Sequence, residues 1–73
     1  MDNDVFVHDT AEVSAEASVG RGSRVWNQAQ IREGAVVGEE CIISKNVYID
    51  ADVVIGARCK IQNNSSVYHG VRL

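Results

Sequence analysis

The sequence predicts an all-β fold, a parallel β-helix made of six-residue repeats, and three observations support this prediction. An aliphatic residue recurs at every sixth position from Val7 to Leu73, without insertion or deletion. The position four residues after each aliphatic residue is always small or β-branched. Proline, which would remove hydrogen-bond donors from a sheet, is absent. Helices repeat their apolar residues about every 3.6 positions and isolated strands every two, whereas a fixed period of six is typical of a parallel β-helix.

The repeat occupies nearly the whole chain. We expect three hexapeptides to form one coil of about 18 residues, so that the aliphatic residues stack in three columns inside the coil. This arrangement predicts about 3.7 coils and a single domain over residues 1–73. The aliphatic positions are Val7, Val13, Val19, Val25, Ile31, Val37, Ile43, Ile49, Ile55, Ile61, Val67 and Leu73.

Composition and charge disfavour several classes of partner. The 73 residues include 7 Lys and Arg residues against 10 Asp and Glu residues, which gives a net charge of −3. This acidic balance argues against nucleic acids and anionic membrane surfaces as partners, and no apolar run approaches the ~18 residues of a membrane span. Residues 1–4 are acidic and do not resemble a signal peptide. We therefore expect a cytoplasmic protein that binds neither nucleic acid nor membrane.

The two cysteines are predicted to be free thiols in the core. Cys41 and Cys59 lie three hexapeptides apart, so they would stack on the inside of successive coils. The spacing of stacked strands, about 4.8 Å, would permit a disulfide by distance. Side chains in register point the same way, however, and this suits the disulfide dihedral poorly. Ser23 is the only other member of this inner column, so we expect no metal site.

The outward positions carry features that the core does not explain. Gly20, Gly38 and Gly56 would form one column that lacks side chains. A second backbone, most simply that of a neighbouring subunit, could approach closely there, although local backbone geometry also accounts for glycine. Trp26 is predicted to point outward, which indicates an interface or a ligand, and we favour an interface.

One corner of the predicted coil is polar but almost uncharged. Asparagine recurs in its two columns. The second column falls at the third place after the aliphatic residue, where we expect a left-handed turn, and asparagine tolerates a left-handed backbone. Amide side chains donate and accept hydrogen bonds, so the corner also suits sugar hydroxyls or a nucleobase edge. The columns are Asn27, Lys45 and Asn63, and Gln28, Asn46 and Asn64.

His69 lies at another corner as a candidate base or phosphate contact, but we favour a solvated residue. No nucleophile–base pair is visible, so the catalytic residues stay unknown.

Four runs of the sequence carry a resemblance to a known family. They are residues 7–11, 23–26, 45–49 and 61–68, of which the last is the most specific. In these runs the chain resembles the left-handed β-helix acyltransferases built on hexapeptide repeats. It is most similar to the amino-terminal part of the N-acetyltransferases that act on the 3-amino group of a UDP-linked amino-sugar uronic acid. Left-handedness is implied by this resemblance alone, because a generic crossover would be right-handed.

The resemblance implies a function and a set of site residues. The implied reaction is acetyl transfer from acetyl-CoA to a nucleotide-linked amino sugar, for the synthesis of surface polysaccharide precursors. The implied assembly is a homotrimer with active sites in clefts between adjacent β-helices. The family's catalytic and CoA-binding coils are expected beyond Leu73, so the alternative is a non-catalytic β-helix module that serves trimeric or end-to-end assembly. The implied nucleotide-sugar-binding residues are Asn46, Gln62, Asn63, Asn64 and Tyr68.

The chain also departs from the family pattern at two places in the polar corner. Asn27 stands where family members often carry histidine after the tryptophan. Ser44 and Lys45 stand where a Gly-Gln pair is common before the asparagine. Lys45 would contact a phosphate or remain solvated.

Overall fold

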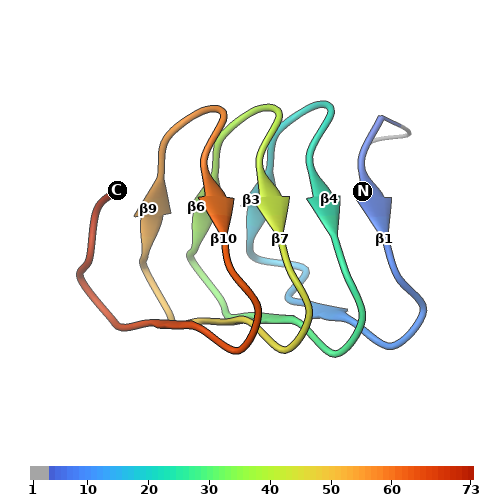
Figure 1. Ribbon diagram of the computed structural model, residues 1–73. Helices are drawn as coiled ribbons and strands as arrows, with labels where there is room; N and C mark the ends of the chain where they lie inside the picture. The colour runs from blue at the N-terminus through green and yellow to red at the C-terminus, as the bar shows by residue number, and fades with distance from the viewer. Residues whose placement is uncertain (1–3) are drawn as a thin grey trace.

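The computed structural model describes residues 4–73, and within them it contains eleven short strands and no helix (Figure 1). Each strand has two residues, and the second is the aliphatic residue of a hexapeptide. The side chain of the first residue points outward, because successive residues on a strand alternate between the two faces. The strands are β1 (Phe6–Val7), β2 (Glu12–Val13), β3 (Ser18–Val19), β4 (Arg24–Val25), β5 (Gln30–Ile31), β6 (Val36–Val37), β7 (Ile42–Ile43), β8 (Tyr48–Ile49), β9 (Val54–Ile55), β10 (Lys60–Ile61) and β11 (Ser66–Val67).

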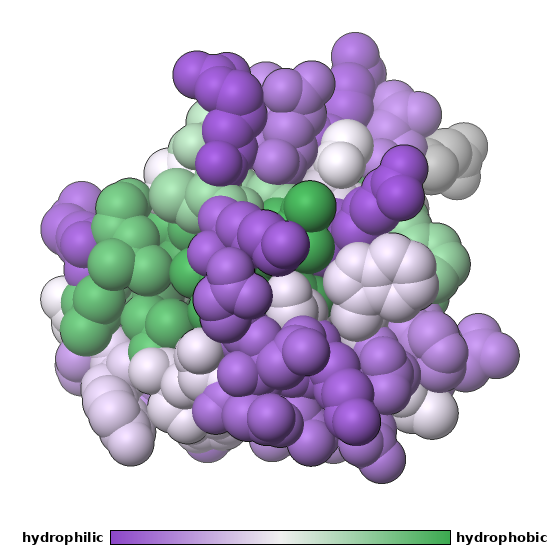
Figure 2. All heavy atoms as spheres, in the orientation of Figure 1, coloured by the Kyte–Doolittle hydropathy of each residue, from purple (hydrophilic) through white to green (hydrophobic). Residues whose placement is uncertain are grey.

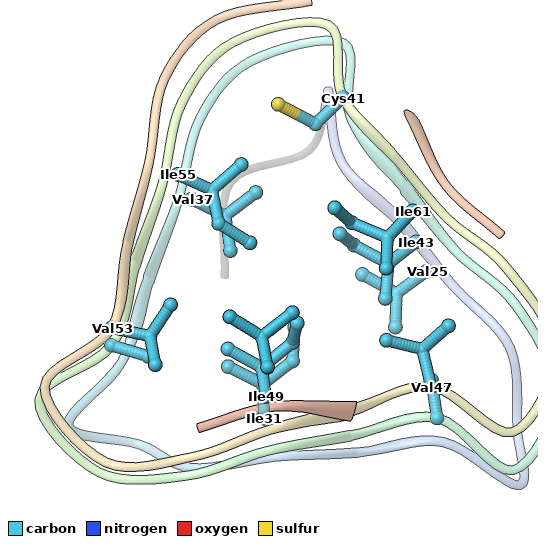
Figure 3. Close-up of a cluster of buried hydrophobic side chains, with 13 residues drawn as sticks. Val25, Ile31, Val37, Cys41, Ile43, Val47, Ile49, Val53, Ile55 and Ile61 are labelled. Carbon is cyan, nitrogen blue, oxygen red and sulfur yellow. The ribbon is translucent and has the colours of Figure 1, made fainter. Parts of the chain in front are cut away.

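The strands form three parallel sheets, which are the three faces of a triangular prism (Figures 1 and 3). The first sheet has the order β1-β4-β7-β10, the second β11-β8-β5-β2 and the third β3-β6-β9. Val7 pairs with Val25, and Ile31 pairs with Ile49, so partners on neighbouring coils are 18 residues apart. The predicted coil length is therefore confirmed.

Backbone hydrogen bonds join the coils in both directions. Strand amides donate to the following coil, as in the 2.9 Å bond from the Arg24 N–H to the Cys41 carbonyl. Turn amides donate back to the preceding coil, as in the 3.1 Å bond from the Asn46 N–H to the Asn27 carbonyl. Both the strands and the turns of an inner coil thus find partners for their polar backbone groups, as buried peptide groups require.

The third residue after the aliphatic position has a positive φ in every turn from Gly22 to Gly70. This confirms the predicted left-handed turns and extends them beyond glycine and asparagine. A left-handed conformation costs other residues roughly 1–2 kcal/mol. The backbone amide of each non-glycine residue with positive φ hydrogen-bonds to the preceding coil, for example from Arg58 to the Glu39 carbonyl at 2.8 Å, which offsets the cost. The other non-glycine residues with positive φ are Gln28, Glu40, Asn46, Asp52 and Asn64.

The core consists of stacked β-branched side chains inside the prism (Figure 3). The three faces contribute the columns Val25–Ile43–Ile61, Ile31–Ile49–Val67 and Val37–Ile55, all of which are buried. Cys41 is fully buried and Cys59 is half-buried, and both thiols are free. The prediction of free thiols on the inner column is confirmed.

The inner column of Ser23 and Cys41 also supplies hydrogen bonds that the sequence did not reveal. The buried Ser23 hydroxyl donates to the Gly38 carbonyl at 2.8 Å and accepts from the Cys41 N–H at 3.0 Å. The Cys41 thiol donates in the same way to the Gly56 carbonyl, with a sulfur–oxygen distance of 3.0 Å. Small polar side chains at this corner therefore bind the glycine carbonyls of the next coil.

The glycine column of the third face is explained by the close approach of successive coils within this chain. A Cβ atom added to Gly20 would lie 2.6 Å from the carbonyl carbon of Gly38. A Cβ atom added to Gly38 would lie 2.7 Å from the backbone nitrogen of Ala57 and the carbonyl carbon of Gly56. The close approach is thus between successive coils, and the column gives no support to the interpretation as a contact with a neighbouring subunit.

Candidate functional site

The polar corner, which we define as Asn27, Gln28, Lys45, Asn46, Asn63 and Asn64, lies between the first and second sheets. Figure 2 shows hydrophilic side chains gathered along the lower edge of the molecule, below the strands of the first sheet. The structure stacks the corner as predicted. The Asn46 side-chain amide donates to the Asn64 amide oxygen at 3.1 Å, and the Asn63 amide oxygen accepts from the Lys45 N–H at 3.2 Å. Three of the predicted site residues therefore lie together.

These asparagines have both a structural role and unused hydrogen-bonding capacity. Asn46 and Asn64 have φ angles of 60° and 62°, so both shape the turns. All three asparagines are exposed, and the Asn63 NH₂ group has no partner among residues 4–73. The corner thus presents amide donors and acceptors in fixed positions, as the recognition of hydroxyl groups requires.

Gln62 and Tyr68, the other predicted site residues, lie at the last coil. Both are exposed, Tyr68 with 66% of its surface accessible. They line a cavity of about 350 Å³ beside the edge strands β10 and β11, together with apolar residues such as Val71 and Leu73. Neither side chain has a hydrogen-bond partner within the described part of the chain. The structure therefore divides the predicted site into a corner with three asparagines and a cavity edge with Gln62 and Tyr68.

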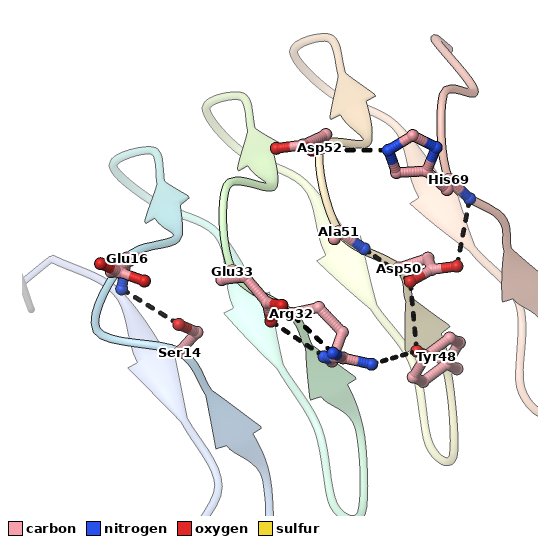
Figure 4. Close-up of polar contacts among 9 residues, drawn as sticks. All are labelled: Ser14, Glu16, Arg32, Glu33, Tyr48, Asp50, Ala51, Asp52 and His69. Atoms are coloured by element: carbon pink, nitrogen blue, oxygen red, sulfur yellow. Dashed lines mark hydrogen bonds and ion pairs between the residues drawn. The ribbon is translucent and has the colours of Figure 1, made fainter.

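A second polar cluster, around His69, was missed by the sequence reasoning (Figure 4). The His69 N–H donates to Asp50 Oδ2 at 3.2 Å, and His69 Nε2 lies 3.4 Å from Asp52 Oδ2. His69 is exposed, as expected of a solvated histidine, and the structure adds two carboxylate neighbours, Asp50 at its backbone N–H and Asp52 at its ring. Asp50 and Asp52 lie about one coil before His69, so alignment of the sequence in coils could have shown this grouping.

Tyr48 and Arg32 extend the cluster along the second face (Figure 4). The Tyr48 hydroxyl accepts from Arg32 Nη1 at 2.9 Å and donates to Asp50 Oδ1 at 3.2 Å. The carboxylate of Glu33 accepts from Arg32 Nε at 2.9 Å and from Nη2 at 3.1 Å. These bonds connect two successive coils on the outside of the prism, and the bond from the His69 backbone N–H to Asp50 adds a third.

The charges of this cluster are set by its hydrogen bonds. The Glu33 carboxylate, and then the Tyr48 hydroxyl, raise the pKa of Arg32 further above its ordinary range. The Arg32 guanidinium in turn lowers the pKa of Glu33. The pKa of Asp50 is lowered chiefly by the Ala51 N–H, with further contributions from the His69 N–H and the Tyr48 hydroxyl. All three groups are therefore ionised at neutral pH.

Acidification is expected to weaken this part of the fold, with Asp50 as one cause. Because the pKa of Asp50 is lower in the folded chain than in the unfolded chain, its contribution to stability is complete above the unfolded value of about 3.9. The contribution is lost as the pH falls through the folded value. Thermal unfolding between neutral pH and about pH 3 should show a shallower acid decline for Asp50→Asn than for the unchanged protein. The control is Asp9→Asn in an exposed turn, and identical declines for all three proteins would contradict the role of Asp50.

Metal-binding clusters and membrane-spanning helices are not found in the described chain. Nowhere in residues 4–73 do three or more His, Cys, Asp or Glu side chains come close enough together to hold a metal ion. The same part of the chain contains no helix that is long and apolar enough to cross a membrane.

The repeat can be matched to a known family. The model of the family described as bacterial transferase hexapeptide (six repeats) matches residues 16–51 and 34–69. Together these spans cover well over half of the 73 residues. The chain belongs to the bacterial transferase hexapeptide family.

Individual relatives of this hexapeptide transferase chain are acyltransferases. It is 29% identical over 58 residues to the acyl-[acyl-carrier-protein]–UDP-N-acetylglucosamine O-acyltransferases of Brucella ovis and Brucella abortus, which covers 80% of this chain and 21% of each relative. Its fold matches that of a variant of perosamine N-acetyltransferase from Caulobacter crescentus, in complex with CoA and GDP-perosamine, with a TM-score of 0.89 and 27% identity. That match covers 94% of this chain and 34% of the other.

These comparisons confirm the fold prediction and the resemblance. The hexapeptide transferase chain is a left-handed parallel β-helix, like the N-acetyltransferase that it matches. It spans about a fifth of the length of the O-acyltransferases and about a third of the length of the N-acetyltransferase. The family assignment supports acyl transfer as the general chemistry.

Proposed function

We propose that this chain is the sugar-nucleotide-binding part of an acetyl-CoA-dependent N-acetyltransferase that acts on a nucleotide-linked amino sugar, in the synthesis of surface polysaccharide precursors. The observation that carries the proposal is the polar corner, where Asn46, Asn63 and Asn64 hold exposed amide groups in register. The O-acyltransferase relatives are named for UDP-N-acetylglucosamine, and the N-acetyltransferase binds GDP-perosamine and CoA. Nucleotide sugars thus occur with both relatives.

In this proposal the chain works by positioning its substrate. Asn63 and Asn64 hydrogen-bond to sugar hydroxyls, Asn46 fixes Asn64, and Gln62 and Tyr68 contact the substrate from the edge of the last coil. The unprotonated sugar amine attacks the thioester carbonyl of acetyl-CoA, the new C–N bond forms, and the C–S bond breaks. The nitrogen loses one proton to solvent, and the departing CoA thiolate takes one up to leave as the thiol. Orientation of the amine and donors to the oxyanion account for much of the acceleration in such a reaction.

The proposed assembly is a cytoplasmic homotrimer, with the substrate in clefts between neighbouring β-helices. Its support on this chain is a set of outward apolar side chains on two faces. Val36 on the third face is 44% exposed, and Ile42 on the first face is 36% exposed. Apolar side chains at outward positions favour contacts with another subunit.

Binding of a UDP-sugar, measured by calorimetry, tests the proposed function. We expect Asn63→Ala and Asn64→Gly each to weaken binding about tenfold, because each removes an amide that bonds to the substrate. Glycine is chosen at Asn64 because it keeps the φ of 62° while it removes the side chain. Gln30→Ala removes an exposed amide on β5 and should leave binding unchanged. Unchanged affinity in both corner variants would contradict the proposal.

A second candidate function is assembly alone, and the edge strands favour it. Strands β10 and β11 pair on one side only, and edge strands of this kind bind further strands. Figure 2 shows hydrophobic side chains gathered at the left-hand end of the molecule, where Figure 1 places the carboxyl terminus. Light scattering at rising concentration should then show trimers or end-to-end stacks without UDP-sugar binding. A stable monomer at high concentration would rule this function out.

A further inference from the structure

An open cavity of about 510 Å³ lies beside the first two coils, outside the polar corner. The side chains that matter in its lining are Phe6 of β1, Arg24 of β4 and Trp26, which directly follows β4. Its size is that of small-molecule sites, which combine aromatic surface with a few polar groups. None of these residues belongs to the nucleotide-sugar site proposed above.

Two exposed aromatic rings supply the apolar part of this cavity. The ring centroids of Phe6 and Trp26 are 5.0 Å apart, and the ring planes meet at 50°. Phe6 is 44% exposed and Trp26 is 36% exposed, so both rings present aromatic surface to solvent. Aromatic rings at such a site stack on planar ligands, and nucleobases are the common example.

Arg24 supplies a positive charge that the rest of the described chain does not neutralise. It is exposed, and its side chain has no hydrogen-bond or ion-pair partner among residues 4–73. The neighbouring arginine differs, because Arg21 Nε lies 3.0 Å from the carboxylate of Asp4. Asp4 also lines the cavity, but this ion pair offsets its negative charge. A guanidinium without a partner is a binding group for phosphate oxygens.

We propose that this cavity binds a nucleoside diphosphate, with the base against Phe6 and Trp26 and the phosphates at Arg24. The inference deepens the proposed function and rests on it, because it assigns the nucleotide half of the substrate to a separate part of the chain. Trp26 directly precedes Asn27, the first residue of the polar corner. Asn63 lies two coils beyond Asn27, about 10 Å at the usual strand spacing, so one extended ligand can reach both places.

The fluorescence of Trp26 reports on this site alone, because the chain has one tryptophan. We expect UDP or GDP, titrated into the purified protein, to quench this fluorescence saturably. Arg24→Gln should weaken the quenching about tenfold or more, since it removes the contact to the phosphates. Arg72→Gln removes the same charge on the third face and should leave the affinity unchanged. Arg24 is exposed, so its replacement should not affect folding.

The variants separate this inference from the proposed function. Quenching by UDP that Arg24→Gln weakens and Asn63→Ala preserves would support the nucleoside site. Absence of saturable quenching, or equal losses in Arg24→Gln and Arg72→Gln, would overturn it. If a UDP-sugar binds without changing the fluorescence of Trp26, and Asn63→Ala weakens that binding, the proposed function stands and the nucleoside site is contradicted. If UDP quenches Trp26 but Asn63→Ala leaves UDP-sugar binding intact, the nucleoside site stands and the polar corner falls.

Discussion

Replacement of Ile43 with alanine is expected to lower the free energy of unfolding by about 2–5 kcal/mol. Ile43 is fully buried and lies in register between Val25 and Ile61 on the neighbouring coils. The backbone bonds that join the coils keep these neighbours from moving into the space that the side chain leaves. The cost therefore includes both the lost burial and the cavity that remains.

Ile42 provides a matched control for this prediction. It is the other residue of β7, but its side chain points outward and is 36% exposed. Ile42→Ala should change the unfolding free energy of the monomer, measured in urea at a protein concentration where light scattering shows no trimer, by no more than about 0.5 kcal/mol. Similar losses for the two variants would mean that the side chains of β7 do not alternate between core and surface as described.

The second large effect is expected at Gly38, where alanine should destabilise the fold by about 1–3 kcal/mol. The new Cβ atom would lie 2.7 Å from two backbone atoms, the nitrogen of Ala57 and the carbonyl carbon of Gly56. Backbone atoms cannot rotate away as a flexible side chain can. Two coils would have to separate, and this would strain the 2.8 Å bond from the Gly38 N–H to the Ile55 carbonyl.

Gly56 shows how the effect should depend on distance. A Cβ atom there would meet only the Leu73 carbonyl oxygen, at 3.2 Å. The melting temperature of a domain of this size falls by about 4–8 °C per kcal/mol, so thermal unfolding resolves the difference. We expect a clearly larger decrease for Gly38→Ala than for Gly56→Ala. The reverse order would contradict the explanation by close approach between coils.

The coil length and the core were predictable because both depend on one short period. Each aliphatic residue from Val7 onward takes part in the same interior column as the residue 18 positions away, so no long-range information was needed. The left-handed turns at Asn46 and Asn64 were predictable for a similar reason, since asparagine tolerates that backbone. Handedness came from the resemblance, because the period itself is compatible with either hand.

The candidate site was predictable only in part. Stacking of Asn46 on Asn64 follows from the period. Tyr68 is separated from the corner because the asparagines precede strand β11, whereas Tyr68 follows it. The grouping of Asp50 with His69 also follows from the period, whereas the bond from Tyr48 to Asp50 depends on side-chain conformations that the period does not determine. The glycine column indicated a close backbone approach or a local backbone requirement, but the sequence could not show that the approaching backbone is that of the next coil.

The constant register of 18 residues has a consequence for how such a molecule can change. Each outward residue shares its position with counterparts one coil away, while the interior beneath it stays the same. Outside the glycine column and the hydrogen-bonded side chains of the second face, a substitution at an outward position therefore changes one exposed place and leaves the core as it is. Ligand preference can therefore change through single substitutions at such exposed positions, with little effect on the stability of the β-helix.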